Sequence, residues 1–238
     1  MEQAKNGKEN NMDVTSYLLG KNASSGGGGG AEEYFNTEVT LVSGSVSQPI
    51  TRDMIKTLPD ITLASNYLNL SNAFANHYVL ETAPKITTEN VTEMNSMFSG
   101  CKVLTKVPNY NTANVTDMSY MFYYCSALET APQMNTSKVT NFSQMFNYCG
   151  ELKNVPIYNF SSATVNSNFG NMFRNCLKLT DESLDNILQS CITATSFTGA
   201  KNLTTFGISS TYYYPVERIQ ALPHYQDFVN AGWSIGYQ

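Results

Sequence analysis

The sequence predicts an α/β solenoid in which 24-residue coils, each made of a short helix and a short parallel strand, stack between terminal caps. Two observations lead to this fold. Three consecutive rows start at a Val-Thr pair, at Val91, Val115 and Val139, and match one another column by column. Prolines keep the same spacing across the repeat, at Pro84, Pro108, Pro132 and Pro156. A period of this length is typical of stacked repeat architectures.

Each row combines a helical pattern with an extended one. In the middle row the apolar residues have the spacing of one helix face. They are Val115, Met118, Met121, Phe122, Cys125 and Leu128. Thr116 stands where an N-cap is expected, and Asp117 suits the positive end of the helix dipole. The segment leading to Pro132 cannot continue a helix and is expected to be a strand.

Weaker copies of the row extend the repeat in both directions, to roughly five or six coils. Upstream, Phe74 and Pro84 keep the phase with His77 in the cysteine column, where we expect a packed core histidine, and Ile55 to Pro59 forms a degenerate copy. Downstream, the pattern resumes after an insertion of three residues, at Phe169, Met172, Phe173, Cys176 and Leu179.

The chain divides into three regions. Residues 1–33 form an N-terminal arm with a glycine linker, residues 34–180 an N-terminal cap and the coils, and residues 181–238 a C-terminal cap. In the cap we expect a helix around 184–191, a strand over 203–208 and helical segments over 216–228. Residues 1–11 are polar and are read as leader sequence. The arm has a compact apolar group that is predicted to be an assembly element, which consists of Val14, Tyr17, Leu18 and Leu19.

The rows resemble the leucine-rich-repeat surface proteins of the BspA type, whose coils read Asn-Val-Thr-x-Met-x-x-Met-Phe-x-x-Cys-x-x-Leu-x-x-x-Pro. The match covers roughly residues 55–180. It implies a leucine-rich-repeat-like α/β solenoid. The opening Met-Asp-Val-Thr-Ser-Tyr-Leu-Leu-Gly-Lys, the glycine run and the segment from Ser183 to Trp233 and beyond are similar to virion proteins of phages and prophages of Gram-positive bacteria.

Composition and charge exclude several function classes. With 14 basic and 19 acidic residues the chain has a net charge of −5 and repels phosphate backbones, so we expect no nucleic-acid partner. No stretch approaches the roughly 20 apolar residues of a membrane span, and the N-terminus lacks the apolar core of a secretory signal. The two histidines, His77 and His224, lie far apart, and Ser99 and Lys102 spell an acyl-enzyme motif without its companion motifs. We expect no enzyme, cofactor or metal.

The cysteines indicate buried free thiols rather than zinc ligands or disulfides. None of Cys101, Cys125, Cys149, Cys176 and Cys191 forms a Cys-x-x-Cys pair. Four of them lie one coil apart on the expected helices. Because packed helices are about 8–10 Å apart and a disulfide needs Cα atoms within roughly 7 Å, we expect the thiols to stay reduced.

Tyrosines are the one feature that indicates binding. Tyr120 and Tyr123 fall opposite the apolar helix face and should point outward, and an exposed phenol ring suits recognition of sugars or proteins. The candidate ligand-binding residues are Tyr120, Tyr123, Tyr124 and Tyr148. The alternative is packing between coils, which we expect for the column of Tyr110, Met134 and Tyr158.

The preferred hypothesis is a non-enzymatic phage virion protein, assembled in the host cytoplasm, whose arm attaches to other virion proteins or to further copies of the chain. Its solenoid would then be displayed to bind a host surface glycan or protein. The alternative is a bacterial cell-surface adhesin with the same repeats, for which a signal peptide and an anchor would be expected.

Overall fold

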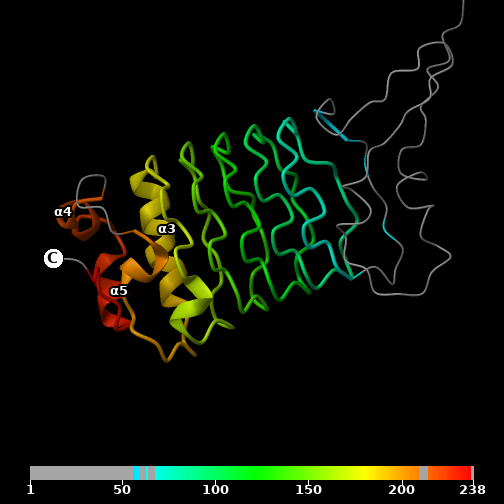
Figure 1. Cartoon of the computed structure of the whole chain (residues 1–238). Coiled ribbons are helices and arrows are strands. Elements are labelled where there is room, and N and C mark those ends of the chain that lie inside the picture. The colour runs from blue at the N-terminus through cyan, green and yellow to red at the C-terminus, as the bar shows by residue number, and fades with distance from the viewer. Residues whose placement is uncertain (1–55, 59, 61–62, 64–67, 209–213, 237–238) are drawn as a thin grey trace, which may run out of the picture.

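The computed structural model describes residues 56–58, 60, 63, 68–208 and 214–236. The predicted arm, the linker and most of the proposed N-terminal cap lie outside the described residues, as do Ile55 and Pro59 of the degenerate copy. From residue 68 onward the chain winds into a row of stacked coils that ends in a group of short helices (Figure 1). The coils are the part of the fold that presents the predicted tyrosines.

Backbone hydrogen bonds hold each coil to the next. Parallel bridges join residues 24 apart, as in the series Asn69, Glu93, Asp117 and Asn141. A second bridged side pairs Thr82 with Lys106 and Thr130 with Asn154, two residues before the prolines. In the described part of the chain these contacts are isolated bridges and not continuous strands, and the coil-to-coil hydrogen bonds beyond each bridge, such as Tyr120 N to Ser143 O at 2.9 Å, come from residues in turns. The predicted short strand is therefore reduced to single bridges.

The predicted helix in each coil is wrong, and consecutive turns replace it. In the middle coil, Met121 N donates to Met118 O at 3.2 Å and Cys125 N donates to Phe122 O at 3.0 Å, which are i→i+3 turn bonds. Alternate amides bind the next coil instead, as Phe122 N does to Met145 O and Tyr124 N to Asn147 O, both at 2.9 Å. Thr116 is not the cap either. The side chain of Asp117 accepts from Ser119 N at 2.7 Å, and Asn69 and Asn141 do the same in their coils.

The apolar columns are buried as the spacing predicted, although no helix carries them. Val115, Met118, Met121, Phe122, Cys125 and Leu128 are all 0% exposed. One phenylalanine from each coil forms a ladder of nearly parallel rings through the core. Its centroid spacings are 5.3, 5.8, 5.4 and 5.6 Å along Phe74, Phe98, Phe122, Phe146 and Phe173. The last step confirms the coil expected after the three-residue insertion.

The cysteine column is buried and reduced, as predicted, for a different reason. All five cysteines are buried thiols that take part in no disulfide. In four coils the thiol donates to the phenylalanine carbonyl of the preceding coil, as Cys125 Sγ does to Phe98 O at 3.2 Å. Burial raises the pKa of the Cys125, Cys149, Cys176 and Cys191 thiols. The thiols are thus unreactive members of the core, and His77, in the same column, is packed at 3% exposure.

Helix α3 (Asp181–Ile192) closes the stack, as the sequence predicted for this segment. Thr180 caps it by accepting from Ser183 N. Its polar side chains then satisfy the backbone edge of the last coil: Ser183 Oγ accepts from Val155 N, and Ser190 Oγ accepts from Tyr158 N, both at 2.8 Å. An edge that is paired with side chains in this way cannot pair with another chain. Figure 1 shows α3 lying against the final coil.

The rest of the cap confirms the helical segments and corrects the strand. Helices α4 (Val216–Gln220) and α5 (Tyr225–Asn230) occupy the region predicted to be helical. The segment predicted to be a strand is instead a 3₁₀ helix, η3 (Leu203–Phe206), and a second one, η2 (Asn166–Phe169), precedes it. The Asn202 side chain accepts from Thr205 N and starts η3, and this local bond competes with a strand.

Candidate functional site

Four predicted tyrosines form one continuous cluster over two coils. Tyr124 stacks on Tyr148 with centroids 4.4 Å apart and planes 20° from parallel. Tyr123 packs edge-on against both of these rings, and Tyr120 packs edge-on against Tyr123 at 5.6 Å. Tyr120, Tyr124 and Tyr148 are 40%, 37% and 38% exposed. The cluster therefore lies on the surface, whereas Tyr110, Met134 and Tyr158 pack between coils as the alternative reading predicted.

Three of these tyrosines have a backbone conformation that side chains of their size disfavour. Each described coil holds two residues at positive φ, four positions apart. Asparagine, serine, glutamine or glycine occupies most of these positions, and such residues are the usual choice there. Tyr120, Tyr124 and Tyr148 have φ of 57°, 61° and 63°. A bulky residue at positive φ strains the backbone locally. Because these three side chains are exposed, burial does not compensate for that strain.

The electrostatics of the cluster are those of a neutral aromatic surface. Desolvation by the surrounding rings raises the pKa of Tyr123, and the neighbouring phenols of Tyr124, Tyr148 and Tyr120 add to the rise. The hydroxyl of Tyr123 is therefore protonated at neutral pH and can donate or accept a hydrogen bond. The arrangement offers flat apolar rings with polar rims, which suits stacking and hydrogen bonding.

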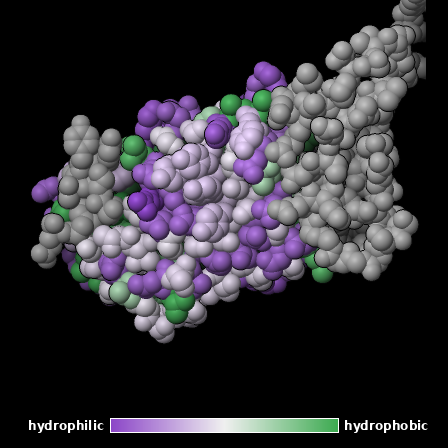
Figure 2. Space-filling view, viewed as in Figure 1, coloured by the Kyte–Doolittle hydropathy of each residue, from purple (hydrophilic) through white to green (hydrophobic). Residues whose placement is uncertain are grey.

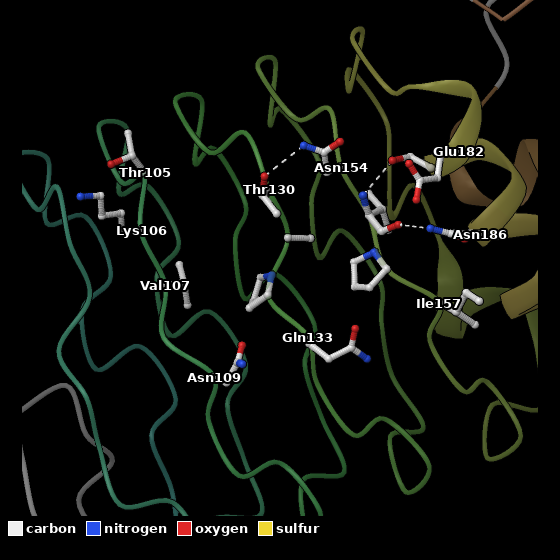
Figure 3. Close-up of a pocket in the computed structure, with 15 residues that line it drawn as sticks. Thr105, Lys106, Val107, Asn109, Thr130, Gln133, Asn154, Ile157, Glu182 and Asn186 are labelled. Atoms are coloured by element: carbon white, nitrogen blue, oxygen red, sulfur yellow. Dashed lines mark hydrogen bonds between the residues drawn. The ribbon is translucent and has the colours of Figure 1, made fainter.

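A groove that the sequence analysis missed runs along the proline side of three coils. It has a volume of about 960 Å³ and is bounded by bridged residues such as Lys106, Thr130 and Asn154. Figure 3 shows this groove with Glu182 and Asn186 of α3 at one end. Asn154 Nδ2 donates to Thr130 Oγ1 at 3.2 Å across two coils. The groove was not predictable from the repeat because α3, which lies outside the repeat, forms one wall.

The walls of this groove are hydroxyls, amides and short aliphatic groups. Asn186 Nδ2 donates to Val155 O at 2.8 Å, so this amide already binds α3 to the backbone at Val155. Ile157, at 44% exposure, is the large apolar side chain exposed beside the groove. The face shown in Figure 2 is mostly hydrophilic or intermediate in hydropathy, with isolated hydrophobic residues. Large aromatic side chains gather at the tyrosine cluster and not in the groove.

Two negative findings apply to the described residues. Within these ranges no group of three or more His, Cys, Asp or Glu side chains is placed to hold a metal ion. No helix in the same part of the chain is long and apolar enough to cross a membrane. The pair formed by His224 Nδ1 and Asp185 Oδ2, at 2.6 Å, joins α5 to α3 and acts as a contact within the cap.

These observations define a repeat protein with a stacked-coil core and an exposed aromatic surface. The chain belongs to the family described as "Mycoplasma protein of unknown function, DUF285", whose model matches residues 68–204. None of the curated proteins matches the sequence. Among solved structures, the chain is similar to the leucine-rich repeat protein TpLRR of T. pallidum, with 15% identity, 53% of this chain and 70% of the other covered, and a TM-score of 0.30.

Proposed function

We propose that this chain is a non-enzymatic adhesion protein whose tyrosine cluster binds a host surface glycan or protein. One observation carries the proposal: Tyr120, Tyr124 and Tyr148 are exposed at positive φ, where other coils hold Asn, Ser, Gln or Gly. Each tyrosine costs about 1–2 kcal/mol in that backbone conformation. The four ring contacts of the cluster, at about 0.5–1.5 kcal/mol per pair, offset a similar amount, so the cluster adds little net stability. A role outside the folded core accounts for their presence.

The proposal also concerns the setting in which the protein acts, which is either a phage virion or a bacterial cell surface. In the preferred version the protein is part of a phage virion, with Val14, Tyr17, Leu18 and Leu19 in the arm that attaches it to the particle. The resemblance of the opening segment and glycine run to phage-encoded proteins supports this version. The second version, a bacterial cell-surface adhesin, is supported by membership of a family described from Mycoplasma.

Substitution of the three strained tyrosines by asparagine tests the adhesion proposal without weakening the fold. The full chain carrying Tyr120→Asn, Tyr124→Asn and Tyr148→Asn should melt at or above the wild-type temperature, because asparagine tolerates positive φ. It should lose binding to intact cells and wall fragments of the bacterium whose prophage encodes the chain or, for a cell-surface adhesin, to the host cells to which the encoding bacterium adheres. Ile157→Asn, which removes an equally exposed apolar side chain beside the groove, is the matched control and should bind normally.

Two results would contradict the proposal. Unchanged binding by the triple variant would remove the tyrosine cluster from any adhesive role. Equal loss of binding by Ile157→Asn would show that the assay reports general surface hydrophobicity. Mass spectrometry of purified virions and of washed cell envelopes then separates the two settings, because the protein should appear in one fraction.

A further inference from the structure

A second pocket borders the tyrosine cluster and is built from residues that the sequence analysis did not single out as a site. It has a volume of about 300 Å³ and draws on three successive coils. Tyr78 and Asn76 come from the first coil, and Tyr123 and Tyr124 come from the third. The remaining lining residues come from the coil between them, and they are Ser99, Gly100 and Lys102.

The pocket exists because the middle coil lacks a large side chain. Gly100 lies in the positive-φ column that holds Asn76 before it and Tyr124 after it. Its φ is 79°, and a Cβ there would lie 2.5 Å from Asn76 Oδ1. Tyr78 and Tyr124 belong to coils two steps apart and to columns two residues apart, and they line the pocket from its first and third coils. Its volume of about 300 Å³ is large enough for one saturated six-membered ring.

The polar groups of the pocket select the charge of its occupant. Lys102 is exposed, and its Nζ lies 5.3 Å from the centroid of the Tyr78 ring. No carboxylate is among the described residues that line the pocket, so the only formal charge there is positive. Ser99 supplies a hydroxyl and Asn76 an amide. Aromatic faces, neutral hydrogen-bonding groups and one ammonium together match a sugar ring that carries an anionic group.

We propose that this pocket binds one anionic pyranose of a surface polysaccharide, with the sugar ring between Tyr78 and Tyr124 and its carboxylate or phosphate on Lys102 Nζ. The proposal rests on the adhesion function proposed above and names its ligand class. The same chemistry occurs in uronic acid polymers and in phosphate-bearing wall polymers, and the two sources are distinguished by experiment. Tyr123 and Tyr148 extend the aromatic surface for the neighbouring sugars of the chain.

Saturation-transfer NMR on the full-length protein tests the proposal with three probes: methyl glucuronoside, glucose 6-phosphate and methyl glucoside. We expect at least one of the anionic sugars to bind about fivefold tighter than the neutral sugar, which is the upper range for an exposed ion pair. The tighter of the two anions identifies the polymer class. Lys102→Gln should remove this preference and leave glucoside binding unchanged. Lys106→Gln, on the opposite bridged side, is the matched control and should keep the preference.

The aromatic wall is tested separately. Tyr78→Ala should weaken all three sugars at least fivefold, whereas Tyr78→Phe should retain binding because the ring is preserved. Tyr78 is 47% exposed, so neither variant should lower the melting temperature by more than a few degrees. Equal affinity for the three sugars, or an undiminished preference in Lys102→Gln, would overturn the proposal. Wild-type cell binding that persists in Tyr78→Ala would overturn this pocket and leave the adhesion proposal standing.

Discussion

Replacing Phe122 by alanine probes what holds the coils together. The ring is 0% exposed and stacks between Phe98 at 5.8 Å and Phe146 at 5.4 Å. Truncation of a buried phenylalanine costs about 3–5 kcal/mol, and each lost ring pair adds about 0.5–1.5 kcal/mol. We therefore expect Phe122→Ala to lower the free energy of unfolding by about 4–8 kcal/mol. Most single domains have only about 5–15 kcal/mol in total.

The position of the ring in the ladder supplies the internal control. Phe173, at 1% exposure, is the final ring of the ladder and stacks on Phe146 at 5.6 Å. Because stability in a repeat stack is a sum of coil and neighbour terms, Phe173→Ala should cost about 1 kcal/mol less than Phe122→Ala. Urea titrations at 25 °C followed by circular dichroism give both values. A cost below about 2 kcal/mol for Phe122→Ala, or an equal or greater cost for Phe173→Ala, would refute the ladder as the main stabilising element.

Four further outcomes are expected. Cys125→Ser should cost only about 1 kcal/mol in a urea titration, because the hydroxyl can keep the hydrogen bond to the Phe98 carbonyl, and a cost above 3 kcal/mol would contradict this. Native protein should resist thiol labelling until denaturant is added, since all five cysteines are buried. The free energy of unfolding should fall as pH rises from about 10 to 12, because burial raises the pKa of Tyr214 to about 12 in the folded state, and Tyr214→Phe should reduce this dependence. Deleting residues 1–30 should leave the melting temperature of the coils unchanged while abolishing incorporation into the particle or self-association; unfolding of the coils would show that the arm is a cap.

The sequence predicted which residues are buried because their burial follows the 24-residue period of the repeat. Every coil must place its apolar side chains against the same side chains of its neighbours, so residues such as Phe122 and Cys125 could be assigned to the core from the 24-residue recurrence. Local conformation was not fixed in the same way. Steps of three and four residues are produced by a helix and also by consecutive turns.

The signal that separates turns from a helix was nevertheless present in the sequence. Asn72 and Asn76 lie four residues apart, as do Asn171 and Asn175, and all four have positive φ. Asparagine and glycine favour that conformation, and both are poor in helix interiors. The two tyrosines Tyr120 and Tyr124 hid the pattern in the middle coil. The helix prediction was therefore weakest where the candidate site is.

The candidate site could be predicted only in part because its members come from different coils. Exposure of Tyr120 followed from its position opposite the apolar residues. Tyr78 and Lys102 stand in one column a coil apart, and the pocket they share with Tyr124 depends on the absence of a side chain at Gly100. A sequence pattern reports the residues that recur, whereas this pocket depends on a residue that departs from its column.

Core positions and surface positions of a stacked-coil protein are under different constraints. Core columns require similar side chains in each coil, because every ring or thiol must contact its copy in the next coil. The positive-φ columns lie outside those core contacts, and one of them holds Asn76, Gly100 and Tyr124 in successive coils. We therefore propose that departures from the repeat at exposed positions carry the specificity of binding. Gly100→Tyr should therefore fill the pocket beside Tyr78 and abolish sugar binding there, and it should lower the urea midpoint because a Cβ at residue 100 would lie 2.5 Å from Asn76 Oδ1.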